Sequence, residues 1–131
     1  MSTPANKLIE QTLTYFADHH GDPYASAFQK LYAADPRYEP LFVLDTDEGL
    51  RRNMMRTTLE MIATYIDDAY AAENLVIGAR LVHLTYEIDD DFDLFFAITR
   101  DVIAEGCTEI WSDAHAAAWV TMLTDFEKAR L

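Results

Sequence analysis

Apolar residues recur at intervals of three and four along almost the whole chain, which is the spacing of amphipathic helices. We expect a first helix from about Asn6 to His19, which Gly21 ends. Asp22 and Pro23 have the character of a cap and a first-turn proline, so they start a second helix. The beginning of the chain therefore predicts two helices joined by a short turn.

Polar residues interrupt the rest of the pattern at similar intervals. Asp35 and Pro36 start a short third turn that ends near Phe42, and an acidic loop covers residues 44–49. A long helix is expected from about Asp47 to about Tyr70. Further helices are expected over 74–84, which could be one helix or a pair, over 92–106 after the cap Asp89–Asp91, and from Ser112 to Phe126. The pattern predicts an all-α chain of about seven helices that forms one domain over residues 1–131.

Composition and charge narrow the classes of partner. The 131 residues include 10 Lys and Arg against 23 Asp and Glu, so the formal net charge is −13. A chain this acidic is not expected to bind nucleic acid or an anionic membrane, because both require positive charge opposite phosphates. With 50% hydrophobic residues, disorder is not expected either.

Cysteine content and hydropathy bear on location. Cys107 has no second cysteine to pair with, which excludes an intramolecular disulfide, a zinc ribbon and an iron–sulfur cluster held by thiolates. No run of 18 apolar residues occurs, and the first residues lack the pattern of a signal peptide. We therefore expect a cytoplasmic protein with no membrane-spanning helix.

The four histidines are the main candidates for chemistry. His19 and His20 are adjacent, so on a helix they point about 100° apart and cannot share a metal. His115 is expected at the surface, whereas His83 lies in the apolar stretch LVHL, where it is either a core residue or a ligand. There is no glycine-rich phosphate loop, nucleophile elbow or pair of Glu-x-x-His motifs, and no enzymatic activity is expected.

Three stretches together resemble the bacterial single-domain globins. FQKLYAADPRYEPLF, from Phe28 to Phe42, has the family's aromatic residue, proline and terminal Leu-Phe pair at matching intervals. HLTYEI, which begins at His83, is similar to the family's stretch that starts with the proximal haem ligand. Trp111 and the pair Ala118-Trp119 resemble the signature of the last helix, so the resemblance extends from Leu8 to Phe126.

The resemblance implies a globin-like fold around one pocket that holds haem b and binds a diatomic gas (O2, NO or CO). It assigns His83 as the iron ligand, since globins hold haem iron on one neutral imidazole. The residues expected to line the ligand side are Phe28, Phe42, Leu50 and Met54. Those that could meet the haem propionates are Arg51, Arg52 and Arg80.

Ligand preference follows from two of these positions. Neither Phe28 nor Leu50 can donate a hydrogen bond, whereas related bacterial globins commonly have donors there. A shift of the register by one residue would place Gly49 or Arg51 at the position of Leu50, and Arg51 could donate. Without a donor, NO and CO are favoured over O2, because they need less help from hydrogen bonds. This predicts gas sensing or weak oxygen binding.

The alternative is a globin-shaped protein without haem. An alignment anchored on Gly78 places Leu81 at the ligand position, which would abolish haem binding. The chain would then act as an interaction or sensor module, and its acidic surface would suit a partner with a basic surface. A homodimer through the last two helices is also possible, with Met122 and Leu123 as candidate contacts.

Overall fold

The computed structural model describes residues 3–84 and 92–131, and these residues form helices and no strand. The elements are α1 (Pro4–His20), α2 (Tyr24–Ala34), the 3-10 helix η1 (Pro36–Phe42), α3 (Gly49–Asp67), α4 (Ala69–Leu84), α5 (Leu94–Gly106) and α6 (Asp113–Lys128). The prediction of an all-α protein with about seven helices is confirmed for the described residues. None of these helices is long and apolar enough to cross a membrane.

Most helices begin and end where the sequence places polar and glycine residues. The Thr3 hydroxyl accepts a hydrogen bond from the Asn6 amide at the start of α1, and Gly21 ends that helix with a φ of 73°. Only glycine adopts such a φ without strain. The Asp35 carboxylate accepts from the Arg37 amide at the start of η1, and Ser112 caps α6. Side-chain caps therefore explain the predicted starts of η1 and α6. The N-cap residues of α2 and α3, Pro23 and Glu48, make no such hydrogen bond.

The boundary between α3 and α4 differs from the prediction. The long helix ends at Asp67, before Tyr70, and α4 begins at Ala69 as one continuous helix rather than near Asn74. Asp68 causes the break, because its backbone is extended (φ −153°) and its carboxylate accepts from the Ala71 amide. A run of apolar periodicity cannot show such a one-residue break. The predicted cap Asp89–Asp91 lies outside the described residues.

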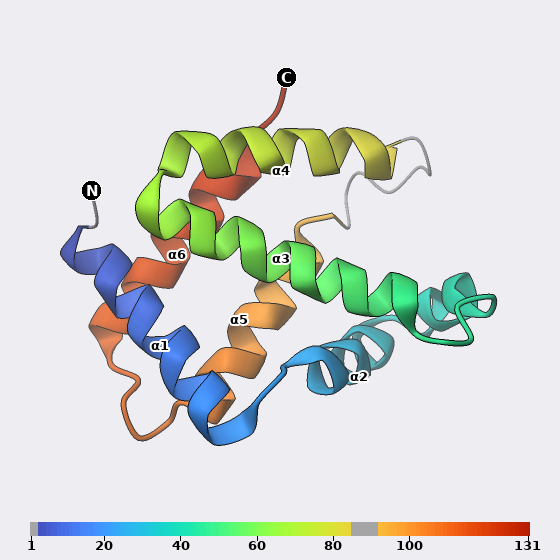
Figure 1. Cartoon of the computed structure of the whole chain (residues 1–131), viewed down its shortest axis with the longest axis horizontal. Coiled ribbons are helices and arrows are strands. Elements are labelled where there is room, and N and C mark those ends of the chain that lie inside the picture. Colours follow the sequence, from blue (N-terminus) through green and yellow to red (C-terminus); the bar gives the residue numbers. More distant parts are fainter. Residues whose placement is uncertain (1–2, 85–91) are drawn as a thin grey trace.

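The helices pack as three pairs: α1 lies on α6, α2 on α5, and α3 on α4, with α1 also against α3 and α5. Figure 1 shows α3 and α4 meeting at their junction and diverging toward the N-terminal end of α3 and the C-terminal end of α4. The helix α4 forms one outer edge of the molecule (Figure 1). The far ends of α3 and α4 therefore lie farther apart than the ends that meet at the junction.

The core is built from the inner sides of all six α-helices in the described part of the chain. Its fully buried side chains include Ile9, Trp119 and Phe126, and the Trp119 indole donates to the buried hydroxyl of Thr12 at 3.1 Å. Met122 and Leu123, predicted as dimer contacts, are also in this core, with 0% and 8% of their surface exposed. The prediction of an interface at these two residues is therefore wrong, because they face inward.

Candidate functional site

His83 lies near the C-terminal end of α4, on the same side of the helix as the buried residues Val76 and Arg80. Its Nδ1 is 2.8 Å from the carbonyl oxygen of Ala79, one turn earlier. A carbonyl can only accept, so Nδ1 carries the proton and Nε2 keeps its lone pair. Within the described residues, Nε2 makes no hydrogen bond. The half-buried ring therefore presents the tautomer that metal-ligating histidines have.

Phe92 lies between His83 and Arg80. Its ring centroid is 5.0 Å from that of His83, and the Arg80 guanidinium carbon is 4.7 Å from the Phe92 centroid. Phe92 is itself buried. The orientation of the imidazole is therefore set from two directions, by the Ala79 carbonyl and by a phenyl ring that a cation holds in place.

Arg80 has a structural role, because its guanidinium is used in hydrogen bonds within the fold. Its guanidinium donates to both carboxylate oxygens of Asp93, at 2.9 Å each, and to the carbonyls of Phe126 and Ala129. The side chain is only 6% exposed. The geometry does not support the expected contact with a haem propionate, because the head group is buried and satisfied at the end of α6. Periodicity could not predict these contacts, because Asp93 and the two carbonyls come from other segments of the chain.

The predicted aromatic residues of the ligand side come together. Phe28 is 4% exposed, and its ring is 5.6 Å from that of Phe42, edge to face, and 5.1 Å from that of Phe95. Phe42 is half-buried at the end of η1. The three rings form one apolar cluster in which α2, η1 and α5 meet.

On the side of α3 that carries Leu50 and Met54, the exposure of the side chains increases toward the N-terminal end of the helix. Met61, on the same side of the helix, is 4% exposed, Met54 is half-buried, and Leu50 is 54% exposed. On the inner side of α4, exposure increases toward the C-terminal end, from Val76 (0%) to the half-buried His83. Both gradients agree with the divergence of the two helices in Figure 1. Apolar side chains thus become accessible at the end of the α3–α4 pair that carries His83.

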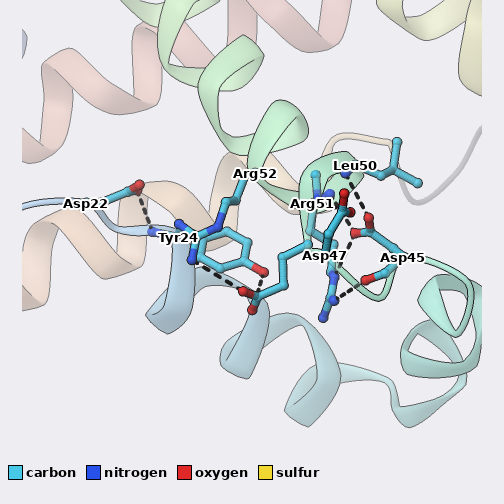
Figure 2. A network of polar contacts seen from close by, with 9 residues as sticks. Asp22, Tyr24, Asp45, Asp47, Leu50, Arg51 and Arg52 are labelled. Atoms are coloured by element: carbon cyan, nitrogen blue, oxygen red, sulfur yellow. Dashed lines mark hydrogen bonds and ion pairs between the residues drawn. The ribbon is translucent and has the colours of Figure 1, made fainter.

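Arg51 is held in a polar network at the start of α3 (Figure 2). The Asp45 carboxylate accepts from the backbone amides of Leu50 and Arg51 and from the Arg51 Nε, at 2.9–3.0 Å. Burial alone would raise the pKa of Asp45, but these donors outweigh burial and hold its pKa below the ordinary value. Arg51 also donates to the Asp45 carbonyl at 2.7 Å. It would have to leave an ion pair to reach a ligand or a propionate.

Arg52 is the most accessible of the three arginines. Its guanidinium lies 4.4 Å from the centroid of the Tyr24 ring and 3.4 Å from a carboxylate oxygen of Glu48, which in turn accepts from the Tyr24 hydroxyl. The side chain is 55% exposed, against 20% for Arg51. Figure 2 shows Arg52 lying over the Tyr24 ring, apart from the Arg51–Asp45 contact.

The arrangement of two interior residues was missed or misjudged from the sequence. His115, expected at the surface, is 6% exposed, with Nδ1 against Ser112 in the cap of α6 and Nε2 2.7 Å from the Gln11 amide oxygen. Tyr32, expected on the apolar side of the second helix, has a buried hydroxyl that makes no hydrogen bond of regular geometry among the described residues and lies within reach of the Arg51 side chain. The alternation of apolar residues gave no signal for either arrangement.

Other candidate sites on the described residues do not include His83. A depression of about 340 Å³ lies along α1 around Lys7, Gln11 and His19, and one of about 170 Å³ lies between α5 and α6. In the described part of the chain, no three His, Cys, Asp or Glu side chains are grouped so that they could hold a metal ion. A haem iron differs from such a metal site, because one protein imidazole suffices for it.

Comparison of the chain with models of known protein families, with curated proteins and with solved structures finds no match.

Proposed function

We propose that the protein is a globin-like haem protein in which His83 is the iron ligand and the bound haem b takes a diatomic gas. The observation that carries this proposal is the state of His83. Its Nδ1 proton is held by the Ala79 carbonyl and its Nε2 is left without a partner among the described residues, on the inner side of α4. His83 differs in this from the buried His115, whose two ring nitrogens both have partners.

The order and pairing of the helices support a globin-like arrangement. A 3-10 helix follows α2, and the later helices return onto the earlier ones in the pairs α1–α6 and α2–α5. The helices α3 and α4 diverge from their junction (Figure 1). Leu50 lies near the start of α3 and His83 near the end of α4, so both are in the parts of these helices farthest from the junction. This is the place where the resemblance expects a cofactor.

The residues in these parts of α3 and α4 include a nitrogen donor and apolar side chains, as a haem site requires. Haem iron would supply one open coordination position at which a gas binds. His83 would bind the iron through Nε2, and the Ala79 carbonyl would keep that nitrogen deprotonated. Met54 and Phe42, both half-buried, would exclude water from the ligand side. Of the three arginines considered for the propionates, Arg52 has the most accessible guanidinium.

The side chains on the ligand side favour NO and CO over O2. Phe28 and Leu50 carry no donor, and the guanidinium of Arg51 is paired with Asp45. In a dry pocket, a hydrogen bond that is not made costs about 1–3 kcal/mol. A gas whose binding depends on a donor therefore binds more weakly here, which suits a sensor better than an oxygen store.

The second candidate function is a haem-free interaction module. It is favoured by the outer face of α4, where Tyr70, Leu75 and Leu81 are 75%, 49% and 42% exposed. Exposed apolar residues that lie together commonly mark a surface for protein contacts.

Absorption spectra distinguish the two candidates. The full chain is purified from haem-supplemented cells, together with His83→Ala and with His19→Ala as a matched control at an exposed histidine. We expect a strong Soret band in the unaltered protein and in His19→Ala, and its loss in His83→Ala. Absence of the band from the unaltered protein would favour the interaction module. A band that persists in His83→Ala would refute the assignment of the ligand.

A further inference from the structure

The outer face of α4 is uncharged, although a quarter of the chain's residues carry a charge. All of α4 lies within the described residues, and its exposed positions include no Asp, Glu, Lys or Arg; they are Ala69, Tyr70, Asn74, Leu75, Gly78, Leu81, Val82 and Leu84. The helix contributes five of the eleven large hydrophobic residues that are exposed in the described part of the chain. In an acidic protein, such a face is the place where another surface can approach without meeting carboxylates.

Within this face, a narrower seam repeats at heptad spacing. Ala71, Asn74, Gly78 and Leu81 follow each other at intervals of three, four and three, which places them on one line along the helix. The line points away from the core, because Val76 and Arg80 occupy the buried side. A Cβ atom added at Gly78 would meet nothing within 4 Å, so the middle of the seam is open.

The seam is complementary to itself when two copies of α4 run antiparallel. We place a two-fold axis across the seam midway between Asn74 and Gly78. Ala71 then lies opposite Leu81 of the second copy, and Asn74 lies opposite Gly78. Each pair sets a small residue against a larger one, which allows the two helices to approach closely. In the antiparallel arrangement, the positive end of each helix dipole also lies beside the negative end of the other, which is favourable.

Charge identifies the second copy as the occupant. A partner with a basic surface would seek carboxylates, and the exposed positions of α4 offer none. Two copies each carry a net charge of −13, so they repel at long range and can meet closely only where both are uncharged. We infer that two copies of this chain associate through an antiparallel contact between their α4 helices. His83 points to the opposite side of α4, so this inference does not depend on haem binding.

The contact is expected to be weak and to strengthen with salt. A helix of 16 residues is about 24 Å long. One such helix pair buries less than the roughly 800 Å² per partner of a standard stable interface. Added salt screens the repulsion between two acidic chains over distances of about 10 Å and leaves an apolar contact intact. A contact built from ion pairs would respond in the opposite direction.

Sedimentation equilibrium of the full chain, over a range of concentrations at low and high NaCl, tests the inference. We expect a monomer–dimer equilibrium whose dissociation constant falls as salt rises. Leu81→Lys should raise that constant by about tenfold or more, because it places a charge in the seam. Val120→Lys is the control, since Val120 is also an exposed apolar residue, 54% exposed, but lies on α6. Both variants make the net charge less negative, so loss of the dimer cannot come from added repulsion.

Cysteine crosslinking tests the direction of the helices. The native Cys107 is fully buried, so new surface thiols react alone. A mixture of the Asn74→Cys and Gly78→Cys proteins should form disulfide dimers faster than either protein alone. Far-ultraviolet circular dichroism verifies that each variant is folded. A chain that stays monomeric at every salt concentration, a dimer that Leu81→Lys leaves unchanged, a dimer that salt weakens, or faster crosslinking of either single variant would overturn the inference.

Discussion

Arg80 and Asp93 face each other through two parallel hydrogen bonds of 2.9 Å, which join the middle of α4 to the start of α5. The same guanidinium donates to the carbonyls of Phe126 and Ala129 at the end of α6. Ala129 is the C-cap residue of α6 and its carbonyl has no partner inside the helix, whereas the Phe126 carbonyl also accepts from the Ala129 amide. One side chain therefore ties α4 to the start of α5 and to the end of α6, and it also supports the Phe92 ring that packs on His83.

Removing the charge of Asp93 should be costly. Asp93→Asn leaves a guanidinium that is 6% exposed without its carboxylate, and breaking such a pair costs about 3–5 kcal/mol. Urea denaturation measures the loss. Glu60→Gln is the control, because the Arg56–Glu60 pair is exposed on α3, and we expect it to cost about 0.5 kcal/mol or less. Equal costs for the two variants would contradict the role given to Arg80.

Gly78 in α4 and Gly106 at the end of α5 should respond in opposite ways to alanine. A Cβ atom at Gly106 would lie 2.5 Å from two ring carbons of Phe16, so Gly106→Ala must displace a packed ring and is expected to cost about 1–3 kcal/mol. Gly78 has open space around it inside α4, and Gly78→Ala should stabilise the helix by about 0.5–1 kcal/mol. Thermal or urea unfolding of both variants gives the comparison. If Gly106→Ala is neutral, α1 and α5 are not in close contact.

The hydroxyls of Tyr65 and Tyr32 can be compared by replacing each tyrosine with phenylalanine. The Tyr65 hydroxyl donates to Asp125 at 2.5 Å, and burial, followed by this carboxylate, raises the pKa of Tyr65 well above its ordinary value. Tyr65→Phe should therefore cost about 1–3 kcal/mol at neutral pH. That contribution is present below about pH 10 and is lost at higher pH, as the hydroxyl ionises.

Tyr32→Phe should cost less than Tyr65→Phe, because the buried hydroxyl of Tyr32 makes no hydrogen bond of regular geometry among the described residues and only lies within reach of the Arg51 side chain. Urea denaturation at neutral pH compares the two variants. A larger loss in Tyr32→Phe than in Tyr65→Phe would mean that the Tyr32 hydroxyl is bonded in solution.

Asp35 gives a prediction in the acid range. The Arg37 side chain and then its backbone amide lower the pKa of Asp35 to about 2. Because the folded-state pKa is depressed, this carboxylate stabilises the fold fully above about pH 4, and its contribution is lost as the pH falls toward 2. An NMR titration of the Asp35 carboxyl carbon should show a midpoint near 2 that returns toward 4 in Arg37→Ala. A midpoint near 4 in the unaltered protein would contradict the pairing.

The sequence predicted those features of the fold that depend on neighbouring residues. Helix starts at Asp35 and Ser112 and the end at Gly21 follow from local capping chemistry, and they were confirmed. The apolar positions Phe28 and Phe42 were expected together because they lie on consecutive elements, and the structure brings their rings to 5.6 Å.

What the sequence could not predict depends on contacts between distant segments. Arg80 is a structural residue because Asp93, Phe126 and Ala129 meet it from α5 and α6. His115 is buried because Gln11 on α1 lies 2.7 Å from its ring. Periodicity identifies the inner side of a helix, but it does not identify which polar groups find partners there.

The proposed function rests on one bond, from His83 Nε2 to iron, and ligand rescue tests that bond most directly. Haemin is added to the His83→Gly protein with and without free imidazole, and the Soret region is recorded for each. The account predicts a weak or shifted band without imidazole and, once imidazole occupies the vacated place, a spectrum close to that of the unaltered protein. A His83→Gly protein whose spectrum already equals that of the unaltered protein, and does not change with imidazole, would contradict it.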